Sequence, residues 1–177
     1  VEASIVFPEE EEEQIDSKQD DKRGTLLNVS GIMLAWAKEK EEAGELALDM
    51  KRCGRKYIRY TTQGTSAILP EAEFATSTWR TKTHYFYEIV NDKGHRMWMQ
   101  LVFNSENMPD DQREICERIN EVFPSRRKNN EWLWRTHFLS QKIKFNENTT
   151  KEDIIVALET CYGEIKSFEQ KLIEKFG

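Results

Sequence analysis

Apolar and polar residues alternate along the middle of the chain, as they do in strands that bury one face of a sheet. Residues 55–62, RKYIRYTT, predict one strand by this pattern. Residues 83–103 predict two more strands, joined by a turn at residues 91–94 whose glycine permits a positive φ. Residues 131–145 predict a further strand or strand pair. The middle of the chain is therefore expected to form an antiparallel sheet around a hairpin.

Two segments have the spacing of apolar residues that is typical of helices. Residues 28–52 combine an apolar group with a charged turn, and Gly44 is a candidate break in this helix. Residues 105–123 predict a middle helix, in which Asn107 is the candidate N-cap and the following Pro and Asp residues suit the first turn. We expect the middle helix to pack on the sheet.

The strongest helix signal closes the chain. Thr149 and Glu152 form a T-x-x-E capping box, and apolar residues then recur at steps of four and three. This pattern predicts a helix of about 25 residues, roughly 38 Å long. The expected partner of its apolar seam is the sheet, and the alternative is a second copy of the chain. The residues of a homodimer through this seam would be Ile154, Leu158, Ile165, Phe168 and Leu172.

These elements together predict an α+β fold, built mainly on an antiparallel sheet with a central hairpin. A middle helix and a long C-terminal helix are expected to pack on that sheet. The length of 177 residues suits one domain with appendages. We divide the chain into an acidic leader at 1–28, a helical connector at 29–52 and the α+β domain at 51–177.

The composition narrows the class of protein. Hydrophobic residues make up 38% of the chain and charged residues 33%, and no apolar run approaches the roughly 18 residues of a membrane span. Three distant cysteines favour a reducing compartment over a disulfide framework, so we expect a cytoplasmic protein. The chain begins at Val1 without a signal pattern, and we expect it to be a piece of a longer polypeptide whose other domains are its partners.

Charge is unevenly distributed along the chain. Residues 1–50 hold 14 acidic and 5 basic residues, a net charge of −9, whereas residues 51–177 hold 18 acidic and 21 basic residues, a net charge of +3. This division suits a nucleic-acid-binding body with an acidic leader, and a leader that is merely solvated is the simpler interpretation. We expect the glutamates at 9–13 to lie near the basic body and to compete with phosphate for it. In the alternative, residues 3–7 dock as an edge strand.

Residues 78–105 concentrate aromatic and basic side chains. Both faces of the predicted hairpin are substantially apolar, so a sheet covered on both faces accounts for most of these aromatic residues as core. Core packing does not account for the segment that precedes the hairpin, which we expect to be exposed. Its candidate surface residues are Trp79, Arg80, Lys82 and His84.

Catalytic and metal-binding motifs are missing from the sequence. The three histidines are scattered, and neither C-x-x-C nor H-x-x-x-H occurs, so we expect no metal site. Phosphate-binding glycine loops are absent too, and we expect no cofactor. Cys116 and Cys161 fall on apolar helix faces, where a thiol usually packs as a small hydrophobe. An enzyme would depend on Glu88, His84 and His137 alone, and we expect no catalytic activity in this segment.

Basic residues form the strongest remaining signal. They gather before the first predicted strand, in the loop before the hairpin and after the middle helix, with aromatic residues nearby. Such groups suit phosphate contacts combined with base stacking. The candidate nucleic-acid-binding residues are Lys51, Arg52, Arg55, Lys56, Arg59, Trp79, Arg80, Lys82, Arg126, Arg127, Lys128 and Arg135. In the alternative interpretation these cations complement a helix C-terminus and discourage pairing at strand edges.

The order of several short segments resembles the C-terminal region of bacterial proteins of the PD-(D/E)XK nuclease family. The segments are KYIRYTT, LPE, STWRTKTHYFYEI, LVFNSENMPDD and WLWRTHF, followed by a helix that ends FEQKLIEKF. The resemblance covers residues 51–177, and the layout is similar to an uncharacterised restriction-associated α+β domain. The nuclease motif is not carried by this segment, since Glu88 on the hairpin is followed by Ile and Val without the Lys. The resemblance therefore implies an accessory domain of a restriction or phage-defence protein.

The sequence thus favours a non-catalytic accessory domain that contacts nucleic acid through basic and aromatic surface residues. A protein-interaction or dimerisation module is the alternative, because the closing helix offers a regular apolar seam.

Overall fold

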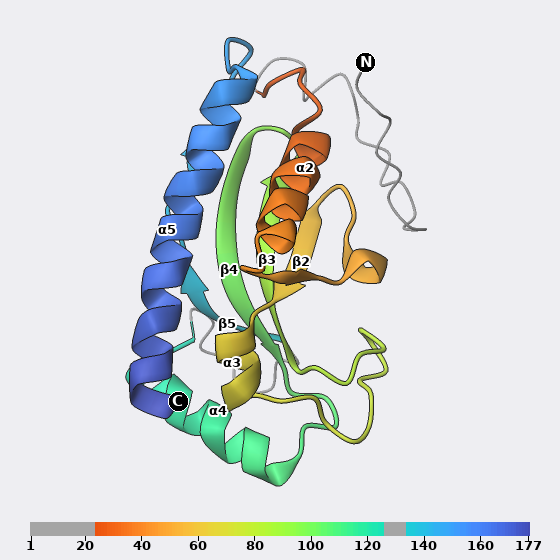
Figure 1. Ribbon diagram of the computed structural model, residues 1–177, viewed down its shortest axis with the longest axis vertical. Coiled ribbons are helices and arrows are strands. Elements are labelled where there is room, and N and C mark those ends of the chain that lie inside the picture. The colour runs from red at the N-terminus through yellow and green to blue at the C-terminus, as the bar shows by residue number, and fades with distance from the viewer. Residues whose placement is uncertain (1–23, 126–133) are drawn as a thin grey trace.

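One antiparallel sheet of six strands organises the part of the chain that the computed structural model describes, residues 24–125 and 134–177 (Figure 1). The strands follow the order β1-β2-β3-β4-β5, and β6 pairs with β4. With helices packed on this sheet, the fold is α+β, as predicted. The strands are β1 Ala47–Leu48, β2 Tyr57–Thr61, β3 Tyr85–Asp92, β4 Arg96–Asn104, β5 Trp134–Leu139 and β6 Ile143–Lys144.

The predicted hairpin is confirmed as β3 and β4. Their register runs from Tyr85 opposite Phe103 to Asp92 opposite Arg96. The turn between them contains Gly94 with φ at 73°, a conformation that glycine adopts without steric cost. Because this register fixes which side chains share a face, it also determines the site described below.

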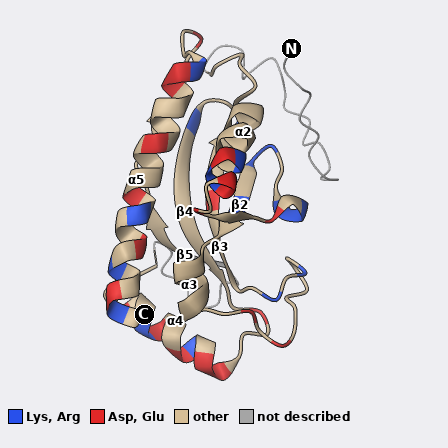
Figure 2. Cartoon of the chain, viewed as in Figure 1, with Lys and Arg blue, Asp and Glu red and all other residues tan. Residues whose placement is uncertain are grey.

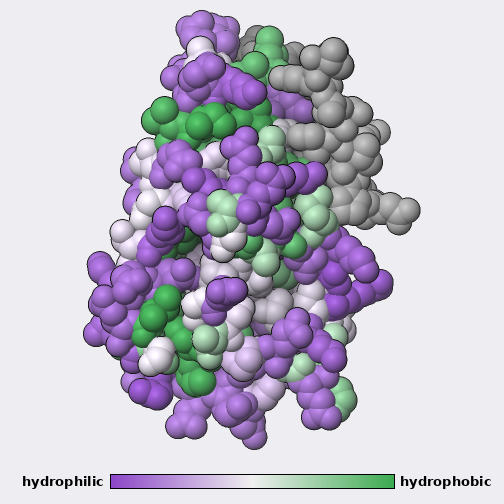
Figure 3. All heavy atoms as spheres, viewed as in Figure 1, coloured by the Kyte–Doolittle hydropathy of each residue, from purple (hydrophilic) through white to green (hydrophobic). Residues whose placement is uncertain are grey.

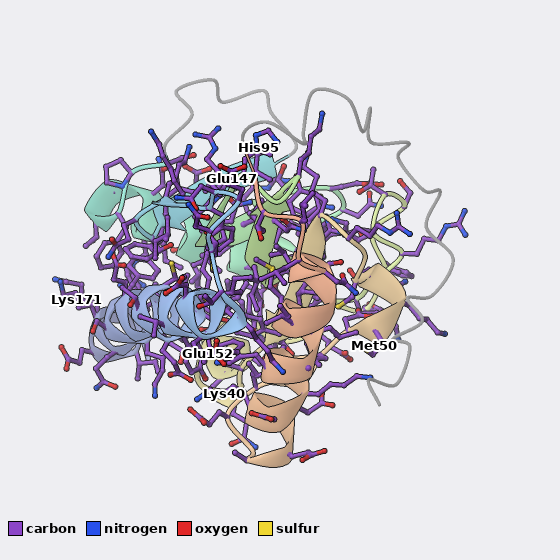
Figure 4. All side chains as sticks on the ribbon, turned by 90° about the horizontal axis from the view of Figure 1, so that it is seen from above. Lys40, Met50, His95, Glu147, Glu152 and Lys171 are labelled. Atoms are coloured by element: carbon purple, nitrogen blue, oxygen red, sulfur yellow. The ribbon has the colours of Figure 1, made fainter. Side chains whose placement is uncertain are left out.

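Four helices and a short 3-10 turn accompany the sheet in the described residues. Both α2 and the much longer α5 lie on the same side of the strands, as Figures 1 and 4 show from two directions. α4 lies near the C-terminal end of α5, and α3 follows β2 directly. The bounds are α2 Val29–Glu42, η1 Met50–Arg52, α3 Gln63–Ile68, α4 Asp110–Val122 and α5 Lys151–Phe176.

The core lies between the sheet and these helices. Met33 and Leu34 of α2 are fully buried in the same cluster as the core residues of β3, β4 and α5. The predicted boundary near residue 51 therefore does not coincide with a break in the core, and α2 is built into the domain. The α5 residues predicted for a homodimer are 0% to 5% exposed and pack within one chain, so self-association through this seam stays a prediction.

The first helix is shorter than the sequence predicted. It ends at Glu42, and Gly44 follows with φ at 77°. The amide of Gly44 donates to the carbonyl of Glu41 and the amide of Glu45 to that of Lys40, which is the Schellman arrangement that closes a helix. The residues after it, predicted as helical, form β1 and η1 instead.

Two predicted helix caps were wrong, one by a single residue and the other by two. The capping box of α5 is formed by Thr150 and Asp153, because the hydroxyl of Thr149 accepts a bond from the amide of Asn146 in the preceding turn. In α4 the N-cap is Pro109, whereas Asn107 has φ at 52° and lies before the helix.

Candidate nucleic-acid interface

The sheet has a second face, opposite α2 and α5, because successive side chains of a strand point to opposite sides. Tyr57 of β2, Val90 of β3 and Trp98 of β4 are direct cross-strand neighbours on that face. Val90 is 1% exposed, and the two aromatic residues on either side of it are half-buried. Neighbouring strands lie about 4.8 Å apart, so the backbones that carry the two rings are roughly 10 Å apart. We call these three residues the aromatic platform.

A continuous row of hydrogen bonds supports the aromatic platform from β4 to β2. The indole N–H of Trp98 donates to Oε1 of Gln100 at 3.0 Å, and the side-chain amide nitrogen of Gln100, Nε2, donates to Oε1 of Glu88 at 2.8 Å. Arg59 donates from Nε to the other oxygen of Glu88 at 2.7 Å. The row fixes the Trp98 ring and neutralises the carboxylate of Glu88, whose side chain is only 5% exposed.

Cations surround both rings of the aromatic platform. Such positions suit cation–π attraction. The distances to the ring centroids are 4.6 Å for Arg59 and 5.3 Å for Lys56 at Tyr57, and 4.6 Å for Lys142 and 5.4 Å for Arg96 at Trp98.

Positive charge exceeds negative charge around the aromatic platform. The acidic residues on this face pair with neighbouring arginines: Glu88 with Arg59, and Asp92 with Arg96 at 2.7 Å. Lys144 lies opposite Arg96 in β6 and is exposed. The charges on the helix side of the sheet are more evenly mixed, since Lys and Arg alternate with Asp and Glu along α5 (Figure 2). The surface on that side is mainly hydrophilic, with separate apolar groups (Figure 3).

The basic residues predicted as one group around the start of β2 have different surroundings in the structure. Lys51, Arg55 and Lys56 are exposed, and Lys56 reaches the aromatic platform. Arg59 is on the platform face, in the ion pair with Glu88. Arg52 has a structural role instead, because its guanidinium donates to the carbonyls of Trp79 and Arg80, at 2.8 Å in each case.

The prediction that Trp79 and His84 are exposed was wrong. Trp79 is 7% exposed, and its ring packs 4.8 Å from that of Phe86 in a small cluster on the second face. His84 is fully buried, with Nδ1 2.9 Å from the carbonyl oxygen of Asn104. Arg80 and Lys82 are exposed as predicted, on the loop that covers this cluster.

The remaining candidates are only partly placed. Arg126, Arg127 and Lys128 lie outside the described residues, as does the acidic stretch at 9–13. The backbone of Arg135 is in β5, opposite Phe103 of β4.

The residues predicted for an enzyme are engaged in structural contacts. Glu88 is held by Arg59 and Gln100, and Nδ1 of His137 lies 3.0 Å from the carbonyl oxygen of Phe123. The three cysteines are buried, and burial raises the pKa of the Cys161 thiol.

Within residues 24–125 and 134–177, no three His, Cys, Asp or Glu side chains come together as a metal ion would require.

Trp98, Arg96, Lys142 and Lys144 were missed by the sequence analysis. Trp98 could have been found from the alternation of side chains in the hairpin, because a turn at Gly94 places Trp98 opposite Val90 on one face of the sheet. The approach of Lys142 depends on the path of the chain after β5, which no local pattern specifies.

Comparison of the chain with protein-family models, with curated proteins and with solved structures finds no match. The resemblance to nuclease-family proteins therefore stays a prediction. Among the described helices, none is both long enough and apolar enough to cross a membrane.

Proposed function

We propose that this chain binds single-stranded nucleic acid on the aromatic platform. One observation carries the proposal: Tyr57 and Trp98 lie in register on the face opposite α2 and α5, and each has two cations within 5.4 Å of its ring centroid.

The chemistry of the aromatic platform fits unpaired bases. Any base can stack on an aromatic ring, whereas the bases of a duplex are already stacked and paired. Arg59 and Arg96 are held by carboxylates, while Lys56, Lys142 and Lys144 are exposed and can follow a phosphate backbone. Binding of this kind tolerates many base sequences and weakens steeply with salt.

Fluorescence anisotropy with the complete chain and a labelled single-stranded oligonucleotide tests the proposal. Trp98→Ala and Tyr57→Ala should each weaken binding about tenfold or more, because stacking on one ring contributes about 1–3 kcal/mol per base. Trp98→Phe keeps a ring and should retain most of the affinity. Phe74→Ala is the matched control, since Phe74 is 69% exposed and is not part of the platform.

Two results would contradict the proposal. One is the lack of any binding at low salt, and the other is equal affinity of the Trp98→Ala and Phe74→Ala variants. A duplex of the same sequence should bind more weakly than the single strand.

A more specific proposal is that this nucleic-acid-binding chain is an accessory domain of a restriction or phage-defence protein. The order of segments shared with nuclease-family proteins over residues 51–177 supports this role.

A further inference from the structure

A pocket of about 260 Å³ opens on the helix side of the sheet. Tyr60 and Tyr87 form one wall, where their rings stack with centroids 5.3 Å apart. Tyr162 and Glu169 of α5 line the pocket, together with Glu45 from the segment after α2. The pocket shares strands β2 and β3 with the aromatic platform but no residue, and it lies on the opposite face of the sheet, so it is a separate site.

The hydroxyl of Tyr60 is the unusual group in this pocket. Tyr60 is 1% exposed, and its hydroxyl oxygen has no hydrogen-bond partner within the described residues. The other two tyrosine hydroxyls have partners: that of Tyr87 bonds to Thr65 at 2.8 Å, and that of Tyr162 donates to Glu45 at 3.3 Å. A buried hydroxyl without a partner is costly, so this position is suited to a ligand that supplies one.

The two carboxylates of the pocket differ in their charge partners. Glu45 is neutralised, with Lys166 at 3.5 Å and Lys40 at 3.9 Å. Glu169 accepts hydrogen bonds from the hydroxyls of Thr62 and Thr65, and no cation among the described residues pairs with it. Its negative charge is therefore solvated by hydroxyl groups but not balanced.

The tyrosines respond to this charge. Burial is the main reason why the pKa of Tyr87 is raised, and the charge of Glu169 raises it further. Burial also raises the pKa of Tyr60, again with a contribution from Glu169. Both hydroxyls are therefore neutral at physiological pH, and each can accept a hydrogen bond from a cationic donor.

We propose that this pocket binds a small primary ammonium ion. The N–H groups of the ammonium donate to the Tyr60 hydroxyl and to the Glu169 carboxylate, and its charge balances that of Glu169. The stacked Tyr60 and Tyr87 rings provide an aromatic wall for the adjoining alkyl chain and for cation–π attraction. An anionic ligand would instead meet an unbalanced carboxylate, which disfavours it.

A titration of the complete chain with n-butylammonium, followed by two-dimensional NMR, tests the proposal. We expect resonances of Tyr60 and Tyr87 to shift, with saturation. n-Butanol has a similar shape without the charge and should bind at least about tenfold more weakly, and butyrate should not shift these resonances.

Substitutions separate the groups that contact the ligand. Glu169→Gln should weaken n-butylammonium binding at least about tenfold, and Tyr60→Phe, which removes only the hydroxyl, should weaken it several-fold without lowering the melting temperature. Glu174→Gln changes an exposed carboxylate on the same helix and should bind as the native chain does. Trp98→Ala should bind normally as well, because it alters only the aromatic platform.

The proposal is overturned if n-butylammonium causes no shifts at Tyr60 and Tyr87, or if n-butanol binds as tightly. If Glu169→Gln does not fold, Tyr60→Phe decides: unchanged affinity in that variant would also overturn it.

Discussion

Among single residues, Glu88 has the central position, because it connects the β2 side of the aromatic platform to the β4 side. Its carboxylate accepts hydrogen bonds from Arg59 of β2 and from Gln100 of β4, and Gln100 in turn accepts from the Trp98 indole. The side chain of Glu88 is 5% exposed and that of Arg59 is 16% exposed. Removing one partner would therefore leave the other charge buried without compensation.

We expect Glu88→Ala to lower the free energy of unfolding by about 3 kcal/mol, because it leaves the Arg59 guanidinium unpaired. The double variant Arg59→Met, Glu88→Met removes both charges and should cost much less than the single substitution. Urea denaturation of the native chain and the variants measures both effects. If the double variant is as unstable as Glu88→Ala, the unpaired charge is not the cause.

Trp79 and Trp98 show how far the burial of single residues could be predicted from the sequence. Trp79 lies in a loop and was expected to be exposed, whereas Trp98 lies in the hairpin, whose aromatic residues were mostly expected to be core. The structure reverses this, since Trp79 packs on Phe86 and Trp98 is half-buried on the second face. A loop that folds back over a sheet depends on long-range packing, and local alternation does not encode it.

At the scale of elements, the start of α5 depends on one capping box. The hydroxyl of Thr150 accepts from the amide of Asp153 at 3.1 Å, and the carboxylate of Asp153 accepts from the amide of Thr150 at 2.9 Å. These two bonds satisfy amides at the helix N-terminus, for which the helix itself offers no acceptor.

We expect Thr150→Ala to lower the free energy of unfolding by about 1 kcal/mol. Asp153→Ala should destabilise the chain more than Glu152→Ala, since both remove an acid from the first turn but only Asp153 closes the capping box. Thermal unfolding distinguishes them. Equal losses for Asp153→Ala and Glu152→Ala would mean that the helix dipole, and not the capping box, accounts for the effect.

Elements with strong periodicity were predicted well, and their ends were not. The hairpin, β2 and α5 were found from alternation and from the seam of α5. The helix predicted over residues 28–52 ends at Glu42, next to Gly44, which was predicted as a candidate break; the part predicted to continue as helix after Gly44 is β1 and η1 instead. In the same way, Thr149 and Thr150 both offer a hydroxyl at the start of α5, and only the turn at Asn146 determines which of them caps the helix.

At the scale of the whole molecule, the chain buries most of its tyrosines on the helix side of the sheet. Burial is the main cause of the raised pKa in four of the five: Tyr60, Tyr85, Tyr87 and Tyr162. A group with a raised pKa binds its proton more tightly in the folded state than in the unfolded state. This stabilisation is fully present below pH 10, the ordinary tyrosine value.

We expect stability to fall as the pH rises above 10, because the unfolded chain then releases tyrosine protons that the folded chain retains. Tyrosinate absorbance and circular dichroism, followed together in an alkaline titration, should change in the same pH range. Ionisation of these tyrosines well before any loss of structure would contradict the burial described here.

The two proposed sites lie on opposite sides of one sheet. The aromatic platform uses Tyr57, Val90 and Trp98, and the ammonium pocket uses the neighbouring residues of the same strands, including Tyr60 and Tyr87. The alternation of strand side chains therefore places the proposed nucleic-acid site and the proposed ammonium site on different faces. We expect the two ligands to bind independently.

A two-dimensional NMR titration of the complete chain with a single-stranded oligonucleotide tests whether nucleic acid binds on the aromatic platform. We expect the Trp98 indole N–H, which donates to Gln100 in the free chain, and the backbone amide of Val90 to shift early and saturably, and the exposed loop residues Arg80 and Lys82 to shift less. Shifts confined to that loop, or the absence of any shift at Trp98 and Val90, would contradict binding on the platform.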